Sequence, residues 1–170
     1  HLIAHSRADS FLARIVDALS QVRGAFSVVL MTDNGLIAAR DPYGLRPLCI
    51  GRLRSSWVVA SETCAFDLLD AEYVREVEPG ELIVITEQGL DSHHPFPKVN
   101  PAMCVFEYVY FARPDSRIFG ANAVYGTRKA LGRRLAQESG VPADVVIPVP
   151  DSGVPAALGY AEGGRIPFET

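Results

Sequence analysis

Cysteine is scarce in this chain, and its three copies, Cys49, Cys64 and Cys104, lie far apart. An odd number of widely spaced cysteines forms no disulfide framework, and the sequence has no CxxC pair of the kind that binds zinc. From composition alone we interpret each cysteine as a small core residue.

An excess of positive charge is also missing, since 16 lysines and arginines face 20 aspartates and glutamates, giving a net charge of −4. Without a basic field, we do not expect the chain to bind nucleic acid or an anionic membrane, and any phosphate site must be local. No apolar run approaches the roughly 18 residues that span a bilayer, and residues 1–7 do not have the layout of a signal peptide. We therefore expect a cytoplasmic protein.

The two ends of the sequence lack features of a complete chain. It begins at His1 inside a helical pattern, without an initiator methionine, and it stops at residues 166–170, where a further strand would begin. We therefore expect a fragment of a longer protein.

Residues 1–100 combine one helical pattern with several short strand patterns. Apolar residues recur at helical spacing over 9–22, after the potential cap Ser10. Turns at 33–35 and 78–81 contain the glycines that tight turns need. Contiguous hairpins of this kind predict an antiparallel sheet with a helix packed on it. The strand patterns lie at 25–31, 36–39, 48–52, 57–60 and 81–86.

A polar, proline-rich break at 91–101 separates this region from the next. An aromatic-rich strand is then predicted at 103–111 and a helix at 124–139, with Leu131 and Leu135 on its apolar side. We interpret the basic residues of that helix as a solvated face: Arg128, Lys129, Arg133 and Arg134.

The last part of the sequence predicts the opening of a parallel sheet. A β-branched strand at 144–149 is followed by a small polar turn and a helix at 156–162. The chain is therefore predicted to hold parts of two domains, with a seam near residues 88–115.

The turn between that strand and helix contains Asp151, Ser152 and Gly153. Backbone N–H groups at a helix N-terminus favour an anionic phosphate, and the two side-chain oxygens would cap the helix or contact Mg²⁺. The alternative is a buried strand followed by an ordinary helix cap, because the turn lacks a GxxxxGK[ST] run. The residues alone leave both interpretations open.

Several segments taken together resemble one family. Residues 40–48 (RDPYGLRPL), 58–66 and 75–81 resemble the later part of a class II glutamine amidotransferase domain. Residues 107–116 (EYVYFARPDS) resemble the crossover into the transferase domain of the amidophosphoribosyltransferases, and the VPDSG run at 149–153 fits the same family. The resemblance covers essentially the whole chain.

The resemblance implies an α/β architecture in two parts. Residues 1–100 would be the C-terminal part of the amidotransferase domain, with the antiparallel sheet and packed helices of N-terminal-nucleophile hydrolases. Residues 101–170 would be the start of a parallel-sheet type I phosphoribosyltransferase domain. In the implied reaction, ammonia from glutamine displaces pyrophosphate from phosphoribosyl pyrophosphate (PRPP) to give 5-phosphoribosylamine, the first committed step of purine biosynthesis. Glutamine and PRPP are the implied partners, and a homo-oligomer is the implied assembly.

The resemblance also assigns site residues. The turn of Asp151, Ser152 and Gly153 would bind the pyrophosphate of PRPP, with Ser152 contacting Mg²⁺. Cys104 falls where some members place one ligand of a [4Fe–4S] cluster, the other ligands lying beyond Thr170, and a buried structural thiol is the alternative. The family's glutaminase nucleophile is a cysteine at the first position of the mature chain, but position 1 here is histidine. We therefore expect no catalytic residue in these 170 residues and no activity from them alone.

Other polar residues are interpreted as structural. Asp41, Arg46 and Glu62 would be buried, hydrogen-bonded supports of the sheet, and Arg113 and Asp115 would fix the linker. Two rival functions stay open: a non-catalytic phosphate- or nucleotide-binding relative of the same architecture, and an amidotransferase of the wider group with another acceptor. The VPDSG turn argues against the second rival.

Overall fold

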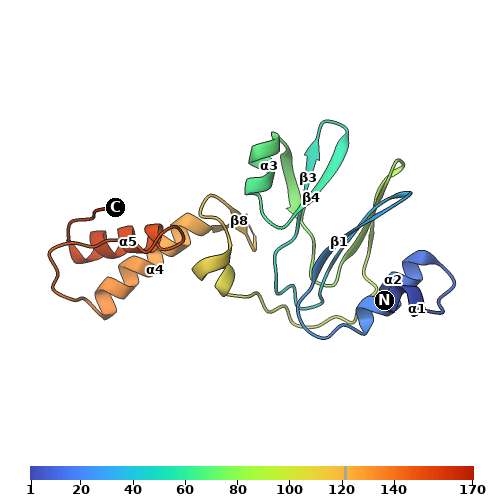
Figure 1. The fold of residues 1–170 in the computed structure, drawn as a ribbon, viewed down its shortest axis with the longest axis horizontal. Coiled ribbons are helices and arrows are strands. Elements are labelled where there is room, and N and C mark those ends of the chain that lie inside the picture. Colours follow the sequence, from blue (N-terminus) through green and yellow to red (C-terminus); the bar gives the residue numbers. More distant parts are fainter. Residues whose placement is uncertain (121) are drawn as a thin grey trace.

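The computed structural model describes residues 1–120 and 122–170. Figure 1 shows an elongated molecule whose larger strands gather at one end, while the helices α4 (Val124–Glu138) and α5 (Val154–Gly164) lie at the other. In the described part of the chain, no helix is long and apolar enough to cross a lipid bilayer.

Two helices open the chain, α1 (Leu2–His5) and α2 (Phe11–Ser20). The Ser10 hydroxyl caps α2 by accepting a 3.1 Å hydrogen bond from the N–H of Ala13. The apolar stripe of α2 places Ile15 in the core, where it is fully buried. The helix predicted for this region is confirmed.

The strands that follow form two antiparallel sheets instead of the single predicted sheet. Strand β6 (Leu82–Thr86) pairs with β2 (Gly35–Arg40) and not with β5 (Glu72–Glu76), which precedes it in the chain. The chain therefore crosses from one sheet to the other. Helix α3 (Cys64–Leu69), β5 and β7 carry no clear pattern in the sequence and were not predicted. The first sheet has the order β1 (Ser27–Thr32), β2 (Gly35–Arg40), β6 (Leu82–Thr86), β7 (Gly89–His93), and the second has the order β4 (Ser56–Ala60), β3 (Cys49–Leu53), β5 (Glu72–Glu76).

Both predicted turns are confirmed. Thr32 and Gly35 are paired at the end of the β1–β2 hairpin, which leaves a two-residue loop between them. In the second turn the N–H of Glu81 donates to the carbonyl of Glu78, and Gly80 has the positive φ of 75° that such a turn requires.

The first sheet is covered on both faces, because side chains of a strand alternate between the two. On one face Ile37 and Ala39 pack with Ile15 of α2. On the other face Ala38 packs with Leu48 and with Ile50 of the second sheet. The core of this part is therefore helix on sheet on sheet.

A π-helical turn, η1 (Glu107–Phe111), stands where a strand was predicted over 103–111, so that prediction is wrong. Aromatic residues favour strands, but in the described residues no strand lies beside this segment to pair with it. Instead the guanidinium of Arg128 donates hydrogen bonds to the carbonyls of Tyr108 in η1 and of Ala112 directly after it. A short hairpin of β8 (Arg117–Ile118) and β9 (Asn122–Ala123) then leads into α4.

The segment 144–149 does not form the predicted buried strand. It makes a single parallel bridge between Val146 and Phe168, in which the N–H of Val146 donates to Pro167 and its carbonyl accepts from Glu169. A buried parallel strand needs neighbours on both sides, and the part of the chain described here supplies one bridge.

Helices α4 and α5 pack through glycine. A Cβ at Gly132 would lie 1.9 Å from the carbonyl oxygen of Ala156, and one at Gly159 would lie 2.0 Å from that of Lys129. No other residue permits so close an approach of two helix backbones. The glycines therefore set the position of α5 and of the turn that precedes it.

Candidate functional site

The turn from Asp151 to Gly153 lies at the start of α5, as the sequence predicted. Asp151 is exposed and Ser152 is half-buried, and no side-chain hydrogen bond caps the helix. A Cβ at Gly153 would lie 2.5 Å from the carbonyl oxygen of Val149, so the turn folds back closely on itself. In this structure the side chains of Asp151 and Ser152 therefore do not cap α5.

This geometry leaves a carboxylate and a hydroxyl beside a helix N-terminus. The N-terminus of the 11-residue helix α5 carries partial positive charge, which favours a phosphate oxygen, but Pro155 in its first turn has no N–H to donate. The oxygens of Asp151 and Ser152 are hard ligands of the kind that Mg²⁺ prefers. Among the described residues, no three side chains of the His, Cys, Asp and Glu types group around a common metal position. The two oxygens fit Mg²⁺ only if phosphate oxygens and water complete its coordination.

The basic face predicted for α4 is only partly solvated. Lys129 Nζ lies 2.6 Å and Arg133 Nη2 2.7 Å from carboxylate oxygens of Glu162 on α5, which ties the two helices together. Arg134 pairs with Glu138 at the surface, as expected for a solvated face. The prediction of an apolar side was wrong, because Leu131 and Leu135 are 49% and 54% exposed. Gly132, between them in sequence, faces α5 instead.

Arg128 departs most from the prediction, because it is 1% exposed. Its Nε donates to the carbonyl of Tyr108 at 2.5 Å and its Nη2 to that of Ala112 at 2.8 Å. Burial lowers the pKa of the guanidinium, and the charge of Glu62 acts in the opposite direction. Arg128 therefore holds the carbonyl ends of η1 against α4.

The cysteines lie apart. Cys49 and Cys64 are buried, as predicted, and burial, helped by the nearby charge of Glu76, raises the pKa of the Cys49 thiol to about 12. Cys104 is half-buried, and its N–H donates to the carbonyl of Leu45. The described residues include no group of three or more His, Cys, Asp or Glu side chains that could hold a metal, so Cys104 fits a [4Fe–4S] cluster only if further ligands come from outside them.

Asp41 supports its loop as predicted. It is fully buried, and its carboxylate accepts hydrogen bonds from the main-chain N–H groups of Phe26, Tyr43 and Leu45. The neighbouring Arg40 was missed, although it begins the same motif; it is 2% exposed.

Arg40 fixes the loop of residues 40–47 to the second sheet. Its guanidinium donates to the carbonyls of Arg46, Gly44 and Val77, and Nη1 lies 3.4 Å from Glu76. A buried arginine that satisfies several carbonyls at once holds a loop in one conformation.

Arg46 and Glu62 are not the buried supports of the sheet that were predicted. Arg46 is partly exposed, forms an ion pair with Glu107 and stacks 4.5 Å from the Phe111 ring centre. Glu62 accepts hydrogen bonds from residues 113–116. Both therefore contact the linker. Burial raises the pKa of Glu107, with Arg46 opposing that shift.

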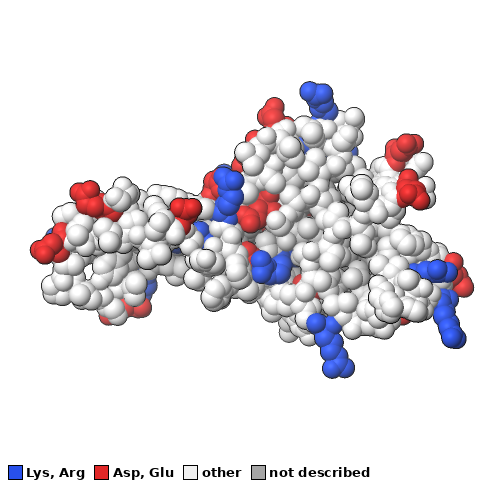
Figure 2. Space-filling view, viewed as in Figure 1, with Lys and Arg blue, Asp and Glu red and all other residues white. Residues whose placement is uncertain are grey.

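Charge on the visible surface is mixed. On the face drawn in Figure 2, basic and acidic side chains are interspersed, with no continuous basic area. This agrees with the net charge of −4 and with the expectation that any phosphate site is local.

Comparison with known proteins shows which proteins this chain resembles. A family model described as a glutamine amidotransferase domain matches residues 2–67. The chain is 52% identical to amidophosphoribosyltransferase 1, chloroplastic, of Arabidopsis thaliana, and 50% identical to the amidophosphoribosyltransferase of Bacillus subtilis, in both cases over 99% of its length. The chain is a relative of the amidophosphoribosyltransferases. It spans 30% and 35% of the length of these two curated relatives.

The fold agrees with this family. A solved structure of the glutamine PRPP amidotransferase of B. subtilis, complexed with ADP and GMP, superposes with a TM-score of 0.93. The match has 50% sequence identity and covers 99% of this chain and 37% of that one. The resemblance inferred from residues 40–48 and 107–116 is therefore confirmed, as is an α/β fold with antiparallel sheets.

Proposed function

We propose that the full protein carrying this sequence is an amidophosphoribosyltransferase. It would take ammonia from glutamine and use it to displace pyrophosphate from PRPP, giving 5-phosphoribosylamine for purine biosynthesis. The observation that carries the proposal is the identity of about half to enzymes of that name over 99% of the chain. Glutamine and PRPP would be its small-molecule partners, in a homo-oligomer in the cytoplasm.

In this proposal the chain contributes to two domains. Residues 1–100 form the C-terminal part of the amidotransferase domain, which the sheets and the match over 2–67 support. Residues 101–170 begin the phosphoribosyltransferase domain, supported by the parallel bridge of Val146 and by the turn and helix α5 that follow it. These 170 residues alone are proposed to be inactive.

The turn at Asp151, Ser152 and Gly153 would receive the leaving group of the reaction. Mg²⁺, when bound, neutralises charge that develops on pyrophosphate as the bond to ribose breaks. The positive end of α5 would attract a phosphate oxygen, and Ser152 and Asp151 would supply oxygen ligands to the metal. Gly153 lets the backbone fold closely enough for both contacts.

Ammonia must reach PRPP without meeting water, because at neutral pH it is mostly the unreactive ammonium ion. A fixed junction between the two parts would serve this need, since delivery within an enclosure raises the effective concentration of the nucleophile. The contacts of Arg46 with Glu107 and Phe111 join the parts in this way.

Cys104 is proposed as one ligand of a [4Fe–4S] cluster whose other ligands come from elsewhere in the full protein. The test is the iron content of the purified full protein and of Cys104→Ser. A protein that holds no iron in either form, purified without oxygen, would make Cys104 a structural thiol.

The function is tested by measuring pyrophosphate release by the full protein. We expect release that requires both PRPP and a nitrogen donor, and that Ser152→Ala reduces by about tenfold or more, the effect of losing one charge-assisted contact in the transition state. A protein that binds PRPP but releases no pyrophosphate would be the non-catalytic relative instead.

A further inference from the structure

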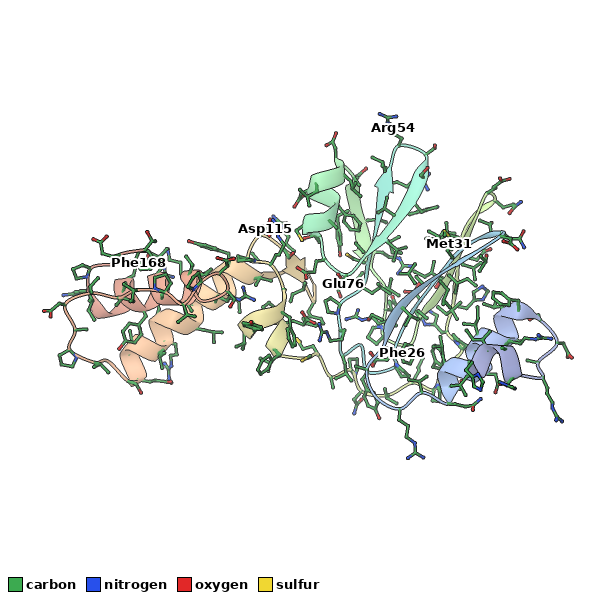
Figure 3. All side chains as sticks on the ribbon, viewed as in Figure 1. Phe26, Met31, Arg54, Glu76, Asp115 and Phe168 are labelled. Atoms are coloured by element: carbon green, nitrogen blue, oxygen red, sulfur yellow. The ribbon has the colours of Figure 1, made fainter. Side chains whose placement is uncertain are left out.

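One short segment, residues 113–120, is bound by side chains of the amidotransferase-like part. Glu62 Oε2 accepts from the N–H of Arg113 at 2.8 Å and from the hydroxyl of Ser116 at 2.7 Å. Next to it, Thr63 Oγ1 accepts from the N–H of Arg117 at 2.9 Å. Glu76 Oε1 accepts from the N–H of Gly120 at 3.1 Å, and Figure 3 labels Glu76 together with Asp115 of the segment.

Glu62 dominates this set of contacts. Both of its bonds to this segment converge on Oε2, which also accepts from the Cys64 thiol at 3.8 Å, and Ser116 is fully buried. Hydrogen bonds to an ionised acceptor are shorter and stronger than neutral ones, and burial of one donor protects the bond from water.

The residues just before this segment are held by Arg128, which donates to the carbonyls of Tyr108 and Ala112. The carboxylate of Glu62 therefore accepts from one N–H and one hydroxyl of residues 113–116, while the guanidinium of Arg128 on α4 donates to carbonyls of residues 108–112. Residues 108–116 lie fixed between Glu62 and Arg128.

A continuous path of contacts leads from Glu62 to the candidate phosphate turn. The first N–H groups of α4, those of Val124 and Tyr125, donate to the carbonyls of Ser116 and Pro114 at 3.0 and 2.9 Å. Helix α4 then packs on α5 through Gly132. The turn at 151–153 begins α5, so its position depends on how firmly Ser116 is held.

We propose that Glu62 is a positioning residue that fixes the junction and thereby places the turn at 151–153 relative to the amidotransferase part. The role deepens the proposed function and rests on it: with the junction loose, ammonia released from glutamine would escape before reaching PRPP. The exposed ion pair of Arg113 and Asp115 does not share this role, because both side chains are more than half exposed and their attraction is screened.

The test compares three variants of the full protein. Glu62→Ala removes the oxygen that accepts both bonds. Glu62→Gln keeps one amide oxygen that can accept both bonds, and Asp115→Asn alters only the exposed pair. The readouts are amide hydrogen exchange in 113–120 and the molar ratio of glutamate formed to pyrophosphate released.

For Glu62→Ala we expect exchange in this segment to become about tenfold faster, the change that loss of one charge-assisted hydrogen bond produces. The ratio of glutamate to pyrophosphate should rise well above the value of about one that a sealed path gives. Turnover with an ammonium salt in place of glutamine should change less than about twofold, because the PRPP site itself is intact. Glu62→Gln should keep most of the slow exchange in 113–120 and most of the low ratio of glutamate to pyrophosphate. Asp115→Asn should behave as the unmodified protein.

An unchanged ratio and unchanged exchange in Glu62→Ala would overturn the proposal, as would equal effects of Asp115→Asn. If Glu62→Ala does not fold, Ser116→Ala is measured instead. We then expect smaller increases in the exchange rate of 113–120 and in the ratio of glutamate to pyrophosphate. The absence of both increases would contradict the role of Glu62. If the unmodified protein releases no pyrophosphate, the proposed function fails, while the exchange measurement still decides whether Glu62 fixes the junction.

Discussion

The close packing of α4 on α5 makes Gly132→Ala a sharp test of the structure. The added Cβ would lie 1.9 Å from a backbone carbonyl oxygen of α5, whereas real Cβ atoms stay beyond about 3 Å of such neighbours. The helices would have to separate by more than about 1 Å, and overpacking of this kind costs about 1–3 kcal/mol. The higher helix propensity of alanine offsets up to about 1 kcal/mol of this loss of stability. We expect a net destabilisation of about 1–2 kcal/mol.

Gly126→Ala is the matched control, because it lies in the same helix and its Cβ would meet nothing within 4 Å. It should stabilise α4 by up to about 1 kcal/mol. The assay is hydrogen exchange of the α4 and α5 amides, which reports the free energy of local opening. If Gly132→Ala protects these amides as well as Gly126→Ala does, the two helices do not pack as described.

Three further predictions concern buried polar groups, each measured by urea unfolding. Asp41→Ala should cost about 3 kcal/mol, because it leaves buried main-chain N–H groups without an acceptor, and Asp41→Asn should cost less. Arg128→Leu should cost a similar amount, about 3 kcal/mol, by leaving the carbonyls of η1 unpaired, and an unaltered midpoint would contradict that role. Burial favours a raised pKa for Glu81, but hydrogen bonds from Arg75, a serine hydroxyl and a main-chain N–H outweigh it and lower the pKa from 4.5. Its contribution to stability is therefore present above 4.5 and lost as the pH falls through the lower folded value, and Glu81→Gln should lack this acid-dependent loss.

Local patterns predicted the elements that depend on local chemistry. The cap at Ser10 and the turn at 78–81 are set by residues next to them, and both were correctly predicted. The family resemblance came from short runs such as residues 40–48, in which the buried Asp41 proved to be a support of the loop.

The errors arose where distant residues decide the outcome. Residues 103–111 have the composition of a strand, but Arg128, far along the chain, binds the carbonyls of a helical turn there. Arg128 itself looked like one more cation on a solvated helix, since burial cannot be read from a charge pattern. Glu62 was predicted to support the sheet, but in the structure it accepts a hydrogen bond from Ser116, which is distant in the sequence.

The most direct test of the central claim follows the amide nitrogen of glutamine. The full protein is given PRPP, Mg²⁺ and glutamine labelled with heavy nitrogen at its amide, and the ribosylamine product is trapped and weighed by mass spectrometry. We expect the label in 5-phosphoribosylamine, in amounts equal to the pyrophosphate released and strongly reduced in Ser152→Ala. Label found only in free ammonia, with PRPP unchanged, would contradict the assignment of this chain to a glutamine-dependent phosphoribosyltransferase.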